Sequence, residues 1–325
     1  PYQLTNGAND VTSLAANTTG NVQYTDFDSL TVGTVGAVNG VTAAGNVTLT
    51  TGGALTVSNG ITTTNNGTVT LTNAGPLTLN ADIAADGAVL QNGAGTVTTG
   101  GAGVRSITTT GDNVTISQSV TLGSDLTVDT QNAGAGNITF NSTIDGGNNL
   151  IVNAGGVTTF GAVVGGTTAL TSLTTDAGGT TAINGGAMTT TGAQTYNDAV
   201  TLGADTTLAG TTPTFGSTVT GGGFDLALNF SGITTITGAN FTGIKNFTSG
   251  NGGTTQLTGA FTTSGSQTYT DAVSLTGATT VASSGPQAIS FNNTVDGAQD
   301  LTVNTGAVTT FGAVVGGTTA LTSLT

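Results

Sequence analysis

The chain has 325 residues, of which 6% are charged, and its net charge is −14 because 16 acidic residues are set against two cations, Arg105 and Lys245. Every acidic residue is Asp, and His, Cys and Trp are absent. Two cations cannot neutralise a series of phosphates, which excludes nucleic acid and anionic lipid as partners. Without His or Cys, thiolate nucleophiles, imidazole bases and the usual zinc sites are excluded as well.

The chain is apolar enough to fold. It is 36% hydrophobic with a mean hydropathy of +0.18, whereas disordered chains are poor in large apolar residues and rich in charge. No apolar stretch approaches the roughly 18 residues that a membrane span requires, so we expect no membrane insertion by this segment.

Short strands are predicted from the N-terminus onward. The clearest region is Asn46 to Ile83, NVTLTTGGALTVSNGITTTNNGTVTLTNAGPLTLNADI, where apolar residues alternate with Thr or Ser and each burst ends at NG, GG or NN. A period of two predicts strands, and Gly and Asn favour the tight turns between them. The predicted interior face carries Val47, Leu49, Leu55, Val57, Val69, Leu71, Leu77 and Leu79. The opposite face carries Thr48, Thr56, Thr70 and Thr78.

The spacing between similar strands decides the fold class. The pairs Val47/Val69, Leu55/Leu77 and Ile61/Ile83 are each 22 residues apart, and the pairs Phe140/Phe160, Phe241/Phe261 and Phe291/Phe311 are each 20 apart. A constant interval places like residues above one another in successive turns. We therefore predict an all-β parallel β-helix, or β-solenoid, of about 15 coils with roughly 19 to 22 residues each.

A longer repeat overlies the coils. The stretch VTTFGAVVGGTTALTSLT occurs at 157–174 and again, unchanged, at 308–325, and QTYNDAVTLGADTTL from Gln194 returns as QTYTDAVSLTGATTV from Gln267. We predict irregular coils over 1–117 and then modules of about 75 residues at about 118–193, 194–266 and 267–325, the last truncated, within one continuous rod. The truncation leads us to expect a segment of a longer array.

Carboxylates are the main candidates for chemistry. Asp26 and Asp28 are two residues apart on a possible strand, so both could face one way, as glycoside hydrolysis requires of its two acids. We favour the simpler interpretation that they are a solvated pair. The module-equivalent pairs Asp145/Asp296 and Asp198/Asp271 are interpreted as acids that stabilise turns by bonding to nearby backbone. We predict no catalytic, cofactor-binding or metal-binding residues.

A loosely bound calcium ion is the one metal that we keep as an alternative, because oxygen ligands alone suffice to bind it. GGGFDL at 221–226 resembles half of a calcium-binding nonapeptide but occurs once. Thr arrays of this kind also occur in ice-binding solenoids, but β propensity alone explains them.

Three further features have simple explanations. Tyr196 and Tyr269 are expected to pack in the interior, and Lys245 is expected to be solvated because an isopeptide bond lacks its usual Glu. The Asn-x-Ser/Thr sequons are as frequent as this composition produces by chance; among them are those that begin at Asn17, Asn46, Asn113, Asn137, Asn141, Asn229, Asn240, Asn246 and Asn292.

The module text resembles a known family. FNSTIDG, GGVTTFGAVVGG, TTAINGG, TTTGAQTYNDAVTLGADTTL and GNVTLTTGGALTV are similar to the repeat regions of filamentous-haemagglutinin-like adhesins and related giant β-strand-repeat surface proteins of bacteria, over most of Asn46 to Thr325. The string from Gln194 to Leu208 is the most specific part. The resemblance implies a right-handed parallel β-helix that a Gram-negative cell exports and displays as a surface fibre.

We therefore expect a structural, non-enzymatic segment of an extracellular adhesin that serves attachment, biofilm cohesion or filament formation. Its expected partners are other copies of itself, further modules of the same chain, and host or matrix glycans. Two alternatives remain open: a self-polymerising filament subunit that stacks end to end, and a β-helical carbohydrate-active enzyme. An enzyme requires at least two carboxylates that converge in a groove.

Overall fold

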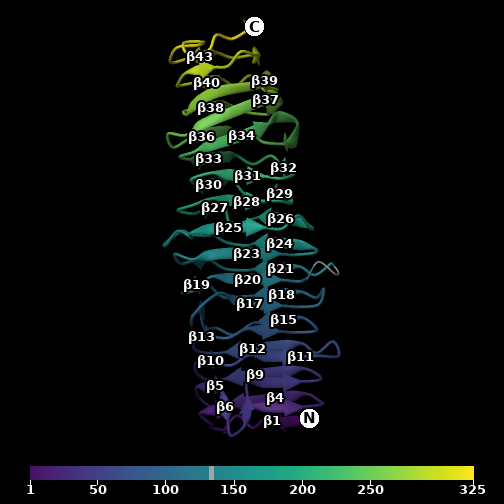
Figure 1. The fold of residues 1–325 in the computed structure, drawn as a ribbon. Helices are drawn as coiled ribbons and strands as arrows, with labels where there is room; N and C mark the ends of the chain where they lie inside the picture. The colour runs from purple at the N-terminus through teal and green to yellow at the C-terminus, as the bar shows by residue number, and fades with distance from the viewer. Residues whose placement is uncertain (132–134) are drawn as a thin grey trace. The chain divides into compact units, whose positions relative to one another are not determined.

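The computed structural model describes residues 1–131 and 135–325. Within them the secondary structure is almost entirely short parallel strands, with one 3-10 turn, η1 (Gly238–Asn240). The strands stack in about 15 turns, which confirms the predicted β-solenoid (Figure 1). The chain divides into two compact units, Pro1–Thr180 and Thr181–Thr325. The module boundaries inferred from the sequence remain a prediction.

Three parallel sheets enclose the core of the N-terminal unit, each turn adding one strand to each sheet. The first sheet contains, in order, β1 (Tyr2–Leu4), β4 (Val22–Asp26), β9 (Val47–Thr51), β12 (Val69–Asn73), β15 (Val89–Gln91), β18 (Val114–Ile116), β21 (Ile138–Phe140) and β24 (Val157–Phe160). The second contains β2 (Ser13–Leu14), β5 (Leu30–Val32), β10 (Leu55–Val57), β13 (Leu77–Leu79), β16 (Val97–Thr99), β19 (Val120–Leu122) and β22 (Ile144–Asp145).

The third sheet of this unit contains β3 (Ala16–Thr18), β8 (Val41–Ala43), β11 (Ile61–Thr63), β14 (Ile83–Ala84), β17 (Arg105–Thr108), β20 (Leu126–Asp129), β23 (Asn149–Asn153) and β25 (Ser172–Thr175). A small antiparallel hairpin of β6 (Thr34–Val35) and β7 (Val38–Asn39) turns at Gly36, which has a φ of 61°. Parallel stacking alone does not predict this hairpin. It lies in a loop between two solenoid strands, where no neighbouring turn dictates its pairing.

The C-terminal unit is built in the same way, and β26 (Thr180–Ile183) lies at its start. Its longest sheet contains β27 (Ala187–Thr189), β30 (Thr206–Gly210), β33 (Leu226–Phe230), β36 (Phe247–Gly250), β38 (Gln267–Tyr269), β40 (Ile289–Phe291) and β43 (Thr309–Phe311). A second contains β34 (Ile233–Thr237), β37 (Thr254–Thr263), β39 (Ala272–Ser283), β42 (Asp300–Asn304) and β44 (Ser323–Leu324), with β41 (Val295–Asp296) paired to β39. Shorter groups are β29 (Ala199–Leu202), β32 (Val219–Thr220) and β35 (Phe241–Thr242), and β28 (Gln194–Tyr196) with β31 (Pro213–Phe215).

Like residues stack on like, as the spacing predicts. Val47 pairs with Val69, Leu55 with Leu77 and Ile61 with Ile83. The eight apolar residues assigned to the interior are all buried, and the four Thr residues assigned to the other face are half-buried. The apolar ladders therefore form the core, because alternate residues of every strand point inward.

Aromatic residues extend two of these ladders. Phe140 stacks on Phe160 with ring centroids 5.8 Å apart and planes 3° apart, and Phe291 stacks on Phe311 at 5.0 Å and 3°. Both pairs are register partners, which confirms two of the three predicted Phe ladders.

The third predicted ladder, Phe241 over Phe261, is wrong. The rings meet edge to face, 6.2 Å apart at 82°. Phe241 pairs in register with Val219, and Phe261 pairs with Val281. The 3-10 turn immediately before Phe241 and a register shift between Leu257 and Gly259 move the two residues onto different strand paths, so equal spacing does not bring them into one ladder.

Polar side chains also point inward at many corners. Asp26, Thr51 and Asn73 occupy successive register positions at strand ends, and all three are buried. The Thr51 hydroxyl donates to the Gly53 carbonyl at 2.9 Å, and the Asn73 amide donates to the Gly75 carbonyl at 2.7 Å. The Gly53 carbonyl also accepts from the Gly75 N–H at 2.9 Å. The buried Thr51 hydroxyl and Asn73 amide therefore have hydrogen-bond partners at the corners, which is the condition for burying polar side chains.

We expect Phe140→Ala to lower the free energy of unfolding of the N-terminal unit by about 3 to 5 kcal/mol, because the fully buried ring leaves a cavity opposite Phe160. Phe27→Ala, at a residue that is 66% exposed in the same unit, should change it by about 0.5 kcal/mol or less. Urea unfolding followed by circular dichroism measures both. Equal effects of the two substitutions would contradict the ladder packing.

Candidate functional site

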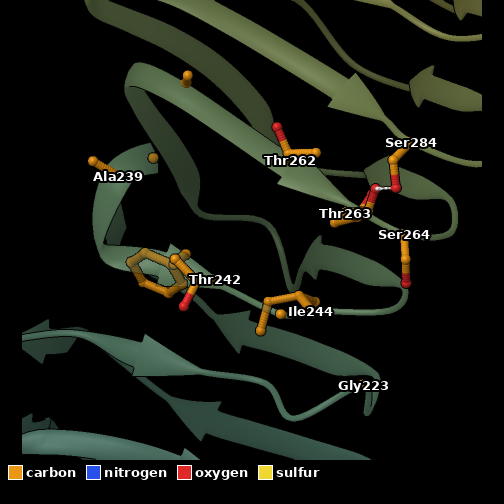
Figure 2. Close-up of a pocket in the computed structure, with 12 residues that line it drawn as sticks. Gly223, Ala239, Thr242, Ile244, Thr262, Thr263, Ser264 and Ser284 are labelled. Carbon is orange, nitrogen blue, oxygen red and sulfur yellow. Dashed lines mark hydrogen bonds between the residues drawn. The ribbon is translucent and has the colours of Figure 1, made fainter.

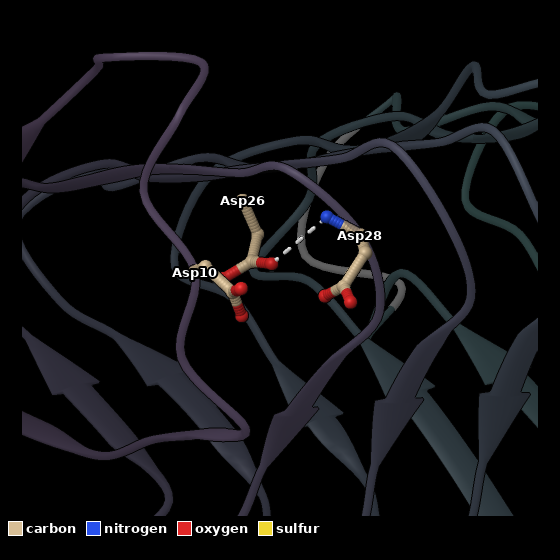
Figure 3. A group of neighbouring side chains, drawn as sticks. All are labelled: Asp10, Asp26 and Asp28. Carbon is tan, nitrogen blue, oxygen red and sulfur yellow. Dashed lines mark hydrogen bonds between the residues drawn. The ribbon is translucent and has the colours of Figure 1, made fainter.

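The closest group of acidic side chains lies near the N-terminus, where Asp10, Asp26 and Asp28 each offer a carboxylate oxygen within 4.8 Å of the others (Figure 3). The two acids expected on one strand face are arranged differently. Asp26 ends β4 and is 2% exposed, whereas Asp28 lies in the following turn and is exposed. Both oxygens of Asp26 are already hydrogen-bond acceptors, one from the Asp28 N–H at 3.2 Å and the other from the Tyr24 hydroxyl at 2.9 Å.

This group therefore stabilises a turn. Asp26 also accepts from the Val11 N–H at 3.2 Å, so it joins β4 to the N-terminal loop. Burial, followed by the hydrogen bond to Asp26, raises the pKa of Tyr24 to about 12, so the Tyr24 hydroxyl stays protonated and donates a hydrogen bond to Asp26. Three carboxylates are a suitable ligand set for a hard cation such as Ca²⁺, but the inner one is already occupied by three donors from the protein.

Asp145 and Asp296, predicted to stabilise turns, do so across turns of the solenoid. One oxygen of Asp145 accepts from the N–H groups of Thr167 and Thr168 at 2.7 and 3.1 Å. The same oxygen of Asp296 accepts from Thr318 and Thr319 at 2.8 and 3.0 Å. The predicted backbone bonding is confirmed, and the partners lie 22 or 23 residues ahead rather than in the local turn.

Asn side chains make the same kind of cross-turn bond. Asn46 accepts from the Thr68 N–H at 3.0 Å, Asn113 from the Asn137 N–H at 2.8 Å, and Asn137 from the Val157 N–H at 2.7 Å. These three residues begin sequons, and so does Asn246, which accepts from the Ser266 N–H at 2.9 Å. Their side chains thus have a structural use that is independent of glycosylation.

The Gly-rich segment at 221–226 forms a turn in which Asp225 also accepts hydrogen bonds from the next turn of the solenoid. Gly222 and Gly223 have φ values of 61° and 89°, which favour glycine. Asp225 accepts from the Asn246 side chain at 2.9 Å and lies 3.8 Å from the Lys245 ammonium. Lys245 is thus an exposed ion-pair partner, and Asp225 is a cross-turn acceptor.

The two QTY segments form a buried polar network. Tyr196 and Tyr269 are fully buried, which confirms their predicted interior position. The Tyr269 hydroxyl donates to the Gln267 carbonyl oxygen at 2.7 Å, and the Gln267 amide donates to the Ala282 carbonyl at 2.7 Å. Tyr196 and Gln194 repeat the arrangement at 2.9 Å. Desolvation raises the pKa of both Tyr hydroxyls well above the usual value, so they act only as neutral donors.

Asp198 and Asp271, each two residues after the Tyr of a Gln-Thr-Tyr segment, have different hydrogen-bond donors. Both are buried. Asp198 accepts from the Thr181 hydroxyl at 2.8 and 3.0 Å. Asp271 accepts from the Gly252 N–H at 2.9 Å, and its second oxygen has no hydrogen-bond partner among the described residues. Equivalent sequence positions therefore have different chemical surroundings.

A surface groove of about 510 Å³ lies in the C-terminal unit (Figure 2). Phe241 and Ile244 form part of its floor, and Thr242, Thr262, Ser264 and Ser284 line its exposed sides. The lining residues include no Asp, Lys or Arg. A glycosidase needs two carboxylates in its groove, and this groove has none.

Sequence reasoning missed the inward-pointing polar corners and the loop residue Asp10. The corners have a recognisable signal, a polar residue two positions before Gly at the end of an alternating strand, as in VTLTTGG and VTLTNAG. Asp10 has none, because it lies in the loop between β1 and β2, and its approach to Asp26 depends on the course of that loop.

Comparisons of the chain with models of known protein families, with curated proteins and with solved structures returned no match. Among the described residues no helix has the length and apolar character needed to cross a membrane.

We expect Tyr269→Phe to destabilise the C-terminal unit by about 1 to 3 kcal/mol, because the buried Gln267 oxygen loses its donor. Tyr2→Phe, whose side chain is exposed, serves as the control and should be neutral. Chemical unfolding curves of both variants provide the measurement. A neutral Tyr269→Phe would show that the network contributes nothing to stability.

Asp296 should contribute a pH-dependent component of stability. Hydrogen bonds from the Thr319 and then the Thr318 N–H lower the pKa of Asp296 below 3.8 in the folded state. A lowered folded-state pKa gives stability that is present above the unfolded-state pKa and is lost as the pH falls through the folded-state pKa. The stability difference between wild type and Asp296→Asn should therefore shrink as the pH falls below 3.8. Urea midpoints across the acidic range test this, and a difference that is constant with pH would refute it.

Proposed function

We propose that the chain is a structural segment of an extracellular bacterial surface fibre, an adhesin of the filamentous-haemagglutinin-like kind, displayed by a Gram-negative cell and serving attachment or cohesion. The observation that carries the proposal is that Asp and Asn side chains bond one turn of the solenoid to the next. Asp145, Asp296, Asn46 and Asn137 all accept hydrogen bonds from the next turn of the solenoid. Groups that an enzyme would use for catalysis here join turns together.

A mechanical role agrees with this construction. Each turn is held by its neighbours, so length is added by repeating turns without designing a new core. The repeated stretch at 157–174 and 308–325 illustrates the mechanism. In both copies a Phe stacks on a Phe of the preceding turn, and a Gly N–H donates to that Phe carbonyl, at 2.8 Å for Gly161 and 2.7 Å for Gly312. A duplicated segment thus makes duplicate contacts.

The groove in the C-terminal unit gives the enzyme alternative little support, because no ionisable side chain lines it. The acidic group of Asp10, Asp26 and Asp28 also gives the enzyme alternative little support, since both oxygens of Asp26 are hydrogen-bonded within the protein. For the glycan partners we expect of an adhesin, the groove offers hydroxyls at Thr262 and Ser264 beside an apolar floor.

The proposal predicts that antibodies raised against the chain label fibres on the surface of the cells that produce it. Deleting its coding region should reduce cell-to-cell cohesion and attachment, which immunogold electron microscopy and a settling assay measure. Label confined to the cell interior, or unchanged cohesion after deletion, would contradict the proposal.

Two measurements on the purified chain separate the alternatives. Incubation with neutral and acidic polysaccharides should release no reducing ends, because the groove lacks carboxylates. Sedimentation over a range of concentrations should show no growth into long polymers; such growth would favour the self-polymerising subunit.

A further inference from the structure

The turn between β36 and β37 holds an Asn-Gly step in an unusual backbone conformation. Asn251 is exposed and has a φ of 93°, and Gly252 has a φ of 83°. A positive φ is uncommon for a residue with a side chain. Among the described residues, the Asn251 side chain makes only a long hydrogen bond, 3.5 Å to the Asn229 carbonyl. Its amide group is therefore accessible to both a neighbouring nucleophile and water.

The nitrogen that follows Asn251 is in contact with a buried carboxylate. The Gly252 N–H donates to Asp271 at 2.9 Å. Asp271 is 1% exposed, and its second oxygen has no hydrogen-bond partner among the described residues. Burial raises the pKa of the Asp271 carboxyl, against a lowering by the N–H groups of Gly252 and Gly253. A carboxylate in such surroundings is a stronger base than one in water.

The equivalent turn one module earlier lacks this arrangement. There the sequence DAGGTT at 176–181 stands where GNGGTT stands at 250–255, so Ala177 replaces Asn251. The Gly178 N–H donates to Asp176 at 3.2 Å, and Asp198 receives the Thr181 hydroxyl. The earlier turn thus has a buried carboxylate, Asp198, but Ala177 in place of the Asn. The later turn combines Asn251, Gly252 and Asp271.

We propose that Asn251 is a self-modification site at which Asp271 acts as the general base for deamidation. The Gly252 nitrogen attacks the side-chain carbonyl carbon of Asn251 as its N–H proton passes to the Asp271 carboxylate. The new N–C bond closes a succinimide ring. The side-chain amide nitrogen leaves as ammonia, taking the proton back from Asp271. Water then opens the ring to Asp or isoaspartate. Overall, Asn251 and one water molecule give a carboxylate side chain and one ammonia molecule.

The chain supplies its own matched controls, because other Asn-Gly steps direct the Gly N–H to a carbonyl. Gly40, after Asn39, donates to the Gly33 carbonyl at 2.8 Å, and Gly67, after Asn66, donates to the Thr64 carbonyl at 3.1 Å. A peptide carbonyl cannot accept a proton as a carboxylate does. The same dipeptide is thus present with and without a base at the reacting nitrogen.

The test is site-resolved peptide mass spectrometry of the full folded chain aged at neutral pH in ¹⁸O-labelled water. We expect label to enter at Asn251 at least about 100-fold faster than at Asn39 or Asn66, the lower end of the range for a positioned general base. In denaturant the three sites should react at similar rates. Comparable rates at the three sites in the folded chain would overturn the proposal, and this comparison needs no variant.

Substitutions give an independent test. Asp271→Asn should slow conversion at Asn251 by about 100-fold or more and leave Asn39 and Asn66 unchanged. Asp198→Asn, at the module-equivalent position, should leave Asn251 unchanged. Circular dichroism checks that both variants fold. A folded Asp271→Asn chain that converts Asn251 at the wild-type rate would show that the carboxylate is not the base.

Discussion

Hydrogen bonding between successive turns is the interaction on which the rest of the structure depends. Each strand pairs in parallel with the strand one turn away, so the backbone of one turn fixes the position of the next at about 4.8 Å. Equivalent side chains are then forced to stack, as Val47 does on Val69 and Phe140 on Phe160. Corners face the same constraint, and the buried side chains of Thr51 and Asn73 donate to the backbone carbonyls two residues further along the chain.

Acidic and amide side chains serve the same bonding between turns. Asp145 and Asp296 accept from pairs of backbone N–H groups one turn ahead, and Asn137 accepts from Val157. Thr167 and Thr168, in the first copy of the unchanged 18-residue repeat, donate to Asp145 at 2.7 and 3.1 Å, and Thr318 and Thr319 in the second copy donate to Asp296 at 2.8 and 3.0 Å. Side chains that hold turns together are suited to a fibre whose length grows by duplication, which is the physical basis of the proposed function.

Much of this architecture was predictable because a ladder leaves a constant interval in the sequence. The 22-residue spacing of Leu55 and Leu77 and the 20-residue spacing of Phe291 and Phe311 each correspond to a register pair. Phe241 and Phe261 share that spacing but lie on different strand paths, because η1 and a register shift intervene. The partners of Asp26 and Asp271 were not predictable, since loop residues such as Asp10 and Gly252 reach them without any periodic signal.

Distances along one outward-facing ladder of the N-terminal unit test the turn-on-turn stacking most directly. The register runs through Gln23, Thr48, Thr70, Leu90, Thr115, Thr139 and Thr159. The chain has no Cys, so pairs of spin labels can be placed at chosen members through introduced cysteines and measured by pulsed electron paramagnetic resonance. Labels on Gln23→Cys with Thr115→Cys, Thr139→Cys or Thr159→Cys should be separated by about 19, 24 and 29 Å, rising by about 4.8 Å per turn. Distances that fail to rise in even steps would contradict the account.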